Sequence, residues 1–407
     1  MSTSTEGTNE TVQYKAVPYR WVILLVFMFV ALMTQILWIT FAPIMSDVAP
    51  HYGVTPDDIL LLTAIYMIIY IPVNFPATWI LDKYGLKWGT GLGVILVGVF
   101  GFLRAFSGTD YNFLLVTQIM TAIGQPFILN SFTKVAVNWF PEKEKATATG
   151  IGTISILLGI LIGIAITPFI YENSNIDSTL MLYGILSLVS MILYFLFVKN
   201  EPDSPPNEFA GQKAFDYSGI KNIFSNKSFL VLCWLMFIGM GVFNAISSDV
   251  DVIFARITLP AEAPGLLGGI IIIGGIIGAG ILSTISDMTK KRVFFLKIAM
   301  VAATLLTYLL IEFNDFTTTA IIAFAFGFFI VSALPVGLIY AAEITYPVTE
   351  EASNGIALML GQISGILFLV LFSLGVNMTM VLFTIFFLTA LLLSFTLKDK
   401  EPIEVTT

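Results

Sequence analysis

Long apolar runs separated by short polar segments dominate the chain between residues 20 and 397. A membrane-spanning helix needs about 20 mostly apolar residues, whereas the strands of a membrane barrel are short and alternate apolar with polar positions. Continuous runs of this length predict helices, which satisfy their backbone hydrogen bonds internally in lipid. Twelve runs qualify: 20–46, 56–81, 88–107, 112–139, 146–171, 178–198, 228–255, 265–286, 293–312, 317–342, 353–375 and 377–397. We therefore expect an all-α integral membrane protein with twelve transmembrane helices.

The polar stretch between the sixth and seventh runs is the longest in the chain and contains three prolines. Such a segment can keep two rigid bundles connected while they move against each other. We expect a cytoplasmic tail, a six-helix bundle, a cytoplasmic linker, a second six-helix bundle and a second cytoplasmic tail: 1–18, 19–198, 199–227, 228–397 and 398–407.

Composition excludes most other classes of protein. Hydrophobic residues make up 57% of the chain and charged residues only 11%, with a mean hydropathy of +0.91, so a soluble enzyme and a disordered protein are ruled out. The net charge of −8 disfavours nucleic-acid binding, which needs clustered Lys and Arg. Cys233 and His51 are the only cysteine and the only histidine, so we expect no disulfide framework, no metal site and no cofactor.

Basic residues are distributed unequally between the two sides of the predicted helices. With the N-terminus inside, seventeen Lys and Arg lie in inner segments or at inner helix ends, and only Arg104 and Arg256 lie outside. Loops rich in Lys and Arg stay on the cytoplasmic side of a membrane. We therefore expect a multi-pass protein of the plasma (inner) membrane with both termini in the cytoplasm.

Two landmarks recur at nearly the same offset, close to half the chain length. Trp-Phe-Pro at 139–141 matches Thr-Tyr-Pro at 345–347 with an offset of 206 residues, and Asp82 matches Asp287 with an offset of 205. We expect that these landmarks match because the chain contains two parallel six-helix repeats. Secondary transporters built in this way bind their substrate near the midplane, between the halves.

Glycines recur at a spacing of four residues in two of the apolar runs, as Gly159 with Gly163 and Gly274 with Gly278. Small residues at this spacing share one helix face and allow two helices to approach closely in lipid. Nucleotide-binding glycine loops follow a strand, so close helix packing is the better interpretation.

The segment after the second predicted helix, 79–87, reads Trp-Ile-Leu-Asp-Lys-Tyr-Gly-Leu-Lys. It resembles the inner-loop motif of the major facilitator superfamily, although Thr78 stands where a Gly is usual and Leu86 where an Arg is usual. The segment 287–290 is a weaker copy in the second half. The resemblance implies a major facilitator fold, with two six-helix bundles related by pseudo-two-fold symmetry.

A narrower resemblance covers nearly all of the membrane region. Five segments are similar to stretches of the feline leukaemia virus subgroup C receptor-related transporters: 38–39, 75–82, 125–129, 343–347 and 362–366. That family is associated with choline and ethanolamine, and historically with haem. The resemblance therefore implies a carrier of one of these solutes.

Three polar or aromatic residues are expected at the depth of a central cavity. Trp38 falls in the outer half of the first helix, where it is either a packing or interfacial residue or an aromatic wall for a cation. Gln125 and Gln362 fall near the midplane, one in each half, and either bond between helices or face the cavity. The resemblance implies that all three contact the substrate.

Other positions depart from the resembling family. Phe243 and Asn244 take the place of a pair of aromatic residues, and Ile339 takes the place of an acidic residue. The resemblance thus implies a less complete aromatic cage and a cavity with one charge fewer. Tyr340 is a further aromatic candidate for the cavity, with simple packing as the alternative.

Charged residues near the helix ends are candidates for gates. We expect an inner gate formed by six of them, with Asp82 facing the start of the eleventh helix near Ala352: Asp82, Lys83, Lys87, Lys134, Asp287 and Glu343. Asp249 and Asp251 near the outer end of the seventh helix are candidate proton sites, although solvated gate residues are the favoured interpretation.

Taken together, these patterns predict a monomeric, non-enzymatic carrier of a small organic solute that works by alternating access in the lipid bilayer. A choline- or ethanolamine-type amine is the preferred substrate, and uniport is the preferred mode because the midplane candidates are neutral. A haem, porphyrin or organic-anion carrier of the same fold, with proton coupling as a further option, is the first alternative. A non-transporting membrane receptor or sensor is the alternative from a different class.

Overall fold

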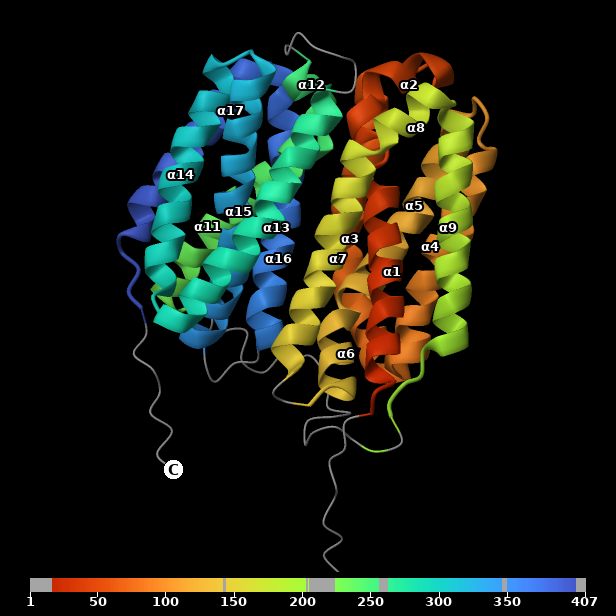
Figure 1. Ribbon diagram of the computed structural model, residues 1–407, viewed down its shortest axis with the longest axis horizontal. Coiled ribbons are helices and arrows are strands. Elements are labelled where there is room, and N and C mark those ends of the chain that lie inside the picture. The colour runs from red at the N-terminus through yellow and green to blue at the C-terminus, as the bar shows by residue number, and fades with distance from the viewer. Residues whose placement is uncertain are drawn as a thin grey trace, which may run out of the picture.

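The computed structural model describes residues 17–141, 144–202, 204, 224–255, 263–345 and 350–399, and these residues are almost entirely helical. Two groups of helices stand side by side (Figure 1). The first group contains α1 (Arg20–Ile39), α2 (Met45–Tyr52), α3 (Pro56–Gly85), α4 (Gly91–Leu103), α5 (Tyr111–Leu129), α6 (Ser131–Trp139), α7 (Lys145–Ala165), α8 (Thr167–Asn173) and α9 (Ile176–Phe197). The second contains α11 (Lys227–Ser248), α12 (Val250–Phe254), α13 (Ala263–Thr289), α14 (Arg292–Glu312), α15 (Phe316–Thr345), α16 (Glu350–Leu371) and α17 (Val376–Ser394).

Eleven helical stretches of the described chain are long and apolar enough to cross a membrane, which confirms an all-helical, multi-pass membrane protein. One stretch, Pro56–Phe106, has 51 residues and would extend about 75 Å if straight, more than twice the hydrocarbon core. It instead reverses at Gly85, whose φ is 76°, and Gly89 packs against the backbone of Leu81. Two expected runs, 56–81 and 88–107, are therefore joined in one stretch that crosses twice.

Polar side chains begin several helices. Thr55 accepts from the Asp58 backbone N–H at the start of α3, and the Asp58 carboxylate accepts from the Thr55 N–H in return, forming a capping box. Asn226 accepts from the backbone N–H groups of Ser228 and Phe229 at the start of α11. These bonds satisfy N–H groups that a helix cannot satisfy internally. The helices therefore start at sites that the sequence marks locally.

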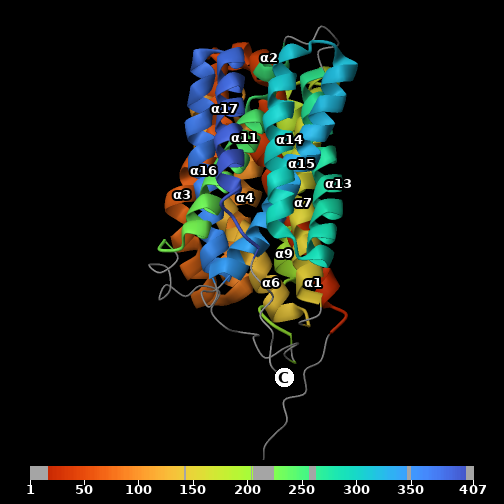
Figure 2. The same ribbon diagram turned by 90° about the vertical axis from the view of Figure 1, so that its left-hand side faces the viewer.

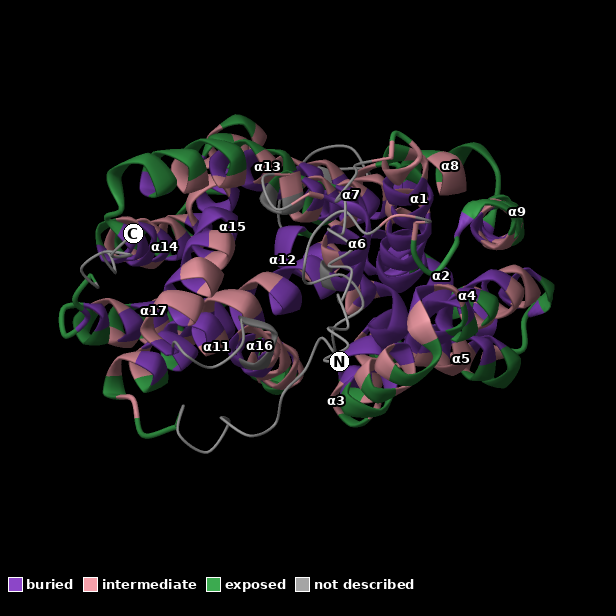
Figure 3. Ribbon diagram, turned by 90° about the horizontal axis from the view of Figure 1, so that it is seen from below, coloured by how far each residue is buried: buried purple, intermediate pink, exposed green. Residues whose placement is uncertain are grey.

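Glycines hold α13 and α15 together. A Cβ at Gly278 would lie 1.9 Å from the carbonyl oxygen of Phe328, and one at Gly327 would lie 1.8 Å from that of Ile271. The two backbones are therefore in direct contact, as the spacing of Gly274 and Gly278 predicts. Residues with exposed side chains gather on peripheral helices such as α9 and α17, and buried ones lie toward the middle (Figure 3).

Within the described residues, the two groups of helices pack against each other near one end of the molecule. We call the end where α1 begins and α17 finishes the terminal face, and the opposite end, with α2 and α12, the far face (Figures 1 and 2). Near the far face, Gly265 of α13 packs on Pro168 and Gly268 packs on Ile164. The Ser46 backbone N–H also donates to the Asp251 carboxylate across the boundary, at 3.0 Å. Helices α7 and α13 then diverge toward the terminal face (Figure 1).

Candidate functional site

A cavity of about 330 Å³ lies between the two groups of helices. Its lining comes from α1, α3, α5, α6 and α7 on one side and from α11, α14, α15 and α16 on the other. Thr149 and Asn354, in the first turns of α7 and α16, belong to it, so it extends toward the terminal face. No residue of the described lining is charged. The cavity is therefore neutral, largely apolar and closed at the far face.

Trp38 lines this cavity one residue before the end of α1. Its indole Nε1 donates to the carbonyl oxygen of Thr63 on α3 at 3.1 Å, and only 6% of the residue is exposed. This bond holds the ring in one orientation and satisfies its only donor. The aromatic surface of the ring is left as the part available to a ligand.

Gln125, Phe243, Asn244 and Gln362 line the same cavity. The two glutamines were expected there from their depth, and Phe243 and Asn244 from the resemblance. Asn244 uses its amide nitrogen to donate to the Gly361 carbonyl at 3.3 Å. Among the described residues, no hydrogen bond is formed by the side chain of Gln125 or Gln362. Interhelical bonding, the alternative explanation for these two glutamines, therefore does not account for them.

Tyr340 is not part of the cavity, and its prediction as a cavity residue is wrong. It is fully buried, and its hydroxyl donates to the Lys398 carbonyl at 2.8 Å near the terminal face. The cavity side of α15 carries Val331, Leu334 and Leu338. Tyr340 follows Leu338 by two residues, which corresponds to a rotation of about 200° around the helix. Its side chain therefore points away from the cavity.

Two further residues near the end of α1 were not singled out from the sequence. Gln35 lines the cavity one turn before Trp38, a spacing that places both on one helix face and could have revealed it. Arg104, expected on the outer side, is fully buried and donates to the Leu37 carbonyl at 3.0 Å and to the Thr40 hydroxyl at 3.1 Å. A cation at the carbonyl end of a helix is electrostatically favourable, so Arg104 holds the end of α1 that carries Trp38.

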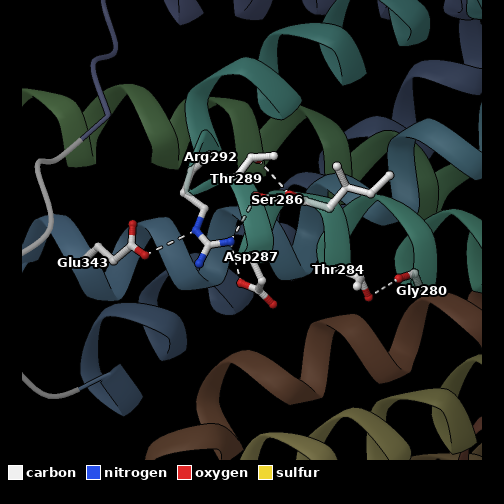
Figure 4. Close-up of polar contacts among 8 residues, drawn as sticks. Gly280, Thr284, Ser286, Asp287, Thr289, Arg292 and Glu343 are labelled. Carbon is white, nitrogen blue, oxygen red and sulfur yellow. Dashed lines mark hydrogen bonds and ion pairs between the residues drawn. The ribbon is translucent and has the colours of Figure 1, made fainter.

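Ion pairs at the terminal face join helices within each half. Lys134 of α6 pairs with Asp82 of α3 at 2.9 Å and also donates to the Leu81 carbonyl. In the other half Arg292, which the sequence did not single out, pairs with Asp287 and, at 3.3 Å, with Glu343 (Figure 4). The side chain of Ala352, expected to lie near Asp82, is outside the described residues.

Two of the expected gate residues, Lys83 and Lys87, make contacts within the first half. The ammonium of Lys83 lies over the rings of Trp79 and Tyr84 on its own helix, at 4.7 and 5.2 Å, and is exposed. The backbone N–H of Lys87 donates to the Asn200 side chain at 2.7 Å, within the same half. Both sets of contacts lie within the first half, and the expected role of Lys83 and Lys87 in an inner gate stays a prediction.

Asp249 is buried rather than solvated, which corrects the favoured interpretation from the sequence. It follows the last residue of α11, is 3% exposed, and its Oδ1 has no hydrogen-bond partner among the described residues. Burial, and then the nearby carboxylates of Asp251 and Asp57, raise the pKa of Asp249 to about 7. Arg256 lies outside the described residues.

Comparisons with known proteins agree with this geometry. The model of the Major Facilitator Superfamily matches residues 24–369. The chain is 32% identical over 384 residues to solute carrier family 49 member A3 of Xenopus tropicalis, covering 90% of this chain and 80% of the relative. It is 29% identical to the choline/ethanolamine transporter FLVCR1 of Felis catus, covering 86% of this chain and 66% of that one.

A solved structure shows the same fold. The crystal structure of a bacterial homolog of the human lysosomal transporter Spinster, inward-facing and unoccupied, superposes with a TM-score of 0.72. It covers 96% of this chain and 100% of its own, at 15% identity. The chain therefore belongs to the Major Facilitator Superfamily, as a non-enzymatic secondary transporter related to solute carrier family 49.

Proposed function

We propose that this transporter moves a small organic amine of the choline or ethanolamine type by alternating access, as a uniporter. The observation that carries the proposal is the neutral cavity between the halves, in which the indole of Trp38 is fixed by its bond to Thr63. An aromatic face attracts an ammonium group without requiring a carboxylate. The relative from Felis catus is a choline/ethanolamine transporter, which supports the same class of substrate.

The orientation and assembly are part of the proposal. We infer that the terminal face lies on the cytoplasmic side of a plasma (inner) membrane, and the seventeen Lys and Arg residues of the predicted inner segments support this orientation. In that orientation the described state, closed at the far face, is inward-facing. We expect the monomer to be the transporting unit, because the cavity is formed by the two halves of one chain.

Uptake into proteoliposomes tests the proposed function. An inside-negative potential of about 100 mV is worth about 2.3 kcal/mol per charge, so a uniporter should accumulate a labelled cationic amine up to about 50-fold. A pH gradient at zero potential should produce almost no accumulation. Protein-free liposomes are the control, and accumulation driven by the pH gradient alone would refute uniport.

Other substrates fit the cavity less well. A haem, porphyrin or organic-anion carrier needs cations to pair with carboxylates, and no described lining residue is Lys or Arg. The cavity lies between two halves that pack together near one end, and this arrangement does not favour a non-transporting receptor or sensor. A small cation therefore remains the preferred cargo.

Proton-linked transport is a second candidate, because Asp249 is buried next to the closed far face. Its carboxyl has an ordinary pKa of 3.8 and a raised pKa of about 7 in the closed state. Closure thus favours the protonated form. The stabilisation that protonation gives to the closed state is complete below the ordinary pKa and is lost as the pH rises through about 7.

We predict that lowering the pH from about 8 to about 6 increases the population with a closed far face. Asp249→Asn should remove this dependence and keep the far face closed, because an amide carries no charge. Spin labels at the exposed Asn173 and Asn314 would report the distance between the halves. Asp177→Asn, an exposed carboxylate on the same face, is the matched control. An unchanged pH response in Asp249→Asn would exclude Asp249 as the proton site.

A further inference from the structure

The cavity that Trp38 lines carries carboxamide side chains from both halves of the protein: Asn130, Asn354 and four others. Gln35 and Gln125 come from α1 and α5, and Asn244 and Gln362 come from α11 and α16. Each carboxamide offers a carbonyl oxygen that accepts and a nitrogen that donates two hydrogens. The polar capacity of this part of the cavity therefore consists of neutral acceptors and donors placed beside an aromatic face.

Most of this hydrogen-bonding capacity is unused by the protein. Within the described residues, the side chains of Gln35, Gln125 and Gln362 form no hydrogen bond. Asn244 engages only its amide nitrogen, with the Gly361 carbonyl. A ligand that displaces water from these groups must replace the hydrogen bonds that water made, since a buried unpaired polar group is costly.

Gln35 shares a cavity-facing side of α1 with Trp38 and is packed against α7. It lies three residues before Trp38 on the same face of α1 and is 2% exposed. On the side of α7, a Cβ at Gly159 would lie 2.7 Å from the Gln35 Cβ, so this glycine allows α7 to press against Gln35. The base of the side chain is thereby confined, at a position where both Gln35 and Trp38 line the cavity.

Primary and quaternary ammonium groups differ in what they can offer such a wall. A primary ammonium has three N–H donors for carbonyl oxygens, whereas a trimethylammonium group has none and depends on aromatic faces. A site built to form hydrogen bonds rejects an analogue that lacks them, because its own polar groups are then left unpaired. The carboxamides therefore favour a ligand that retains N–H groups.

We propose that Gln35 is a specificity-determining residue of this transporter, whose carboxamide oxygen accepts an N–H of a primary ammonium group lying against Trp38. The carrier consequently prefers primary to quaternary amines. This inference rests on the proposed function as an amine transporter and adds the chemical class that the cavity selects. Gln125, Asn244 and Gln362 complete the site from the remaining helices.

A methylation series tests the inference on the purified, full-length protein. Binding would be measured by calorimetry for ethanolamine, N-methylethanolamine, N,N-dimethylethanolamine and choline, which lose N–H donors one by one. In the unmodified protein the affinity should fall along the series, with choline at least about tenfold weaker than ethanolamine, as expected for losing a hydrogen bond to a charged group.

Variants of Gln35 distinguish the effect of losing its carboxamide from the effect of changing its side-chain volume. Gln35→Leu and Gln35→Met should weaken ethanolamine about tenfold, leave choline within about twofold and flatten the series. Gln35→Asn keeps the carboxamide and should retain part of the fall in affinity from ethanolamine to choline. Thermal unfolding of each variant confirms that it folds, and the two apolar variants differ in shape, so at least one well-folded variant is expected.

The possible outcomes distinguish this inference from the proposed function. A flat or rising affinity along the series in the unmodified protein overturns the role of Gln35 while leaving amine transport intact. Equal losses of ethanolamine and choline binding in both apolar variants also overturn it, since they would indicate a packing role. If the unmodified protein binds none of the four amines, the proposed function is refuted and this inference is refuted with it.

Discussion

Replacing Trp38 with Ala should reduce amine uptake by at least about 30-fold. A desolvated cation–π contact is worth about 2 kcal/mol, and the alanine also removes a side chain that lines the cavity and bonds to Thr63. Trp38→Phe should retain part of the uptake, because phenylalanine keeps an aromatic face but attracts cations less strongly than tryptophan.

Initial rates in proteoliposomes would measure this effect. Trp88→Ala is the matched control, because Trp88 is 61% exposed and does not line the cavity. It should transport at close to the unmodified rate. If Trp38→Ala folds normally and also transports at that rate, Trp38 does not contact the substrate.

Introducing a methyl group at Gly278 should cause a large loss of stability. The new Cβ would lie 1.9 Å from the Phe328 carbonyl oxygen, which belongs to the backbone of α15 and cannot rotate away. The two helices would have to separate, and overpacking of this kind costs about 1–3 kcal/mol or more. Gly278→Ala should therefore unfold at a distinctly lower temperature in detergent and accumulate poorly in membranes.

Gly280→Ala is the matched control on the same helix. A Cβ there meets nothing within 4 Å, so the substitution should be neutral or stabilising by up to about 1 kcal/mol. Equal melting temperatures for Gly278→Ala and Gly280→Ala would show that α13 and α15 are not packed backbone to backbone.

The number and type of helices could be derived from the sequence because lipid is a uniform apolar solvent. A run of sufficient length and hydropathy must form a helix there, whatever surrounds it. The joined stretch Pro56–Phe106 shows the limit of this reasoning. Hydropathy located both crossings, but the continuous helical turn around Gly85 depends on backbone angles and on Gly89 packing against Leu81.

Depth along a helix also follows from the sequence, and rotation around it does not. Gln125 and Gln362, expected near the midplane from their depth, line the cavity, as does Trp38, which the resemblance singled out. Tyr340 has a suitable residue type but lies on the side of α15 away from the cavity. Every face of a membrane helix is apolar, so hydropathy gives little indication of which face meets the cavity.

By itself, the sequence determined an all-helical membrane protein, because the length and hydropathy of an apolar run are local properties of the chain. The internal repeat predicts two halves in addition. The tertiary structure decided the environment of each charged and polar group. Arg104 and Asp249 look alike as charges near outer helix ends. Yet Arg104 holds the end of α1, whereas Asp249 is buried with an oxygen that has no partner among the described residues. Burial and partners come from helices distant in sequence, so only the packed structure assigns them.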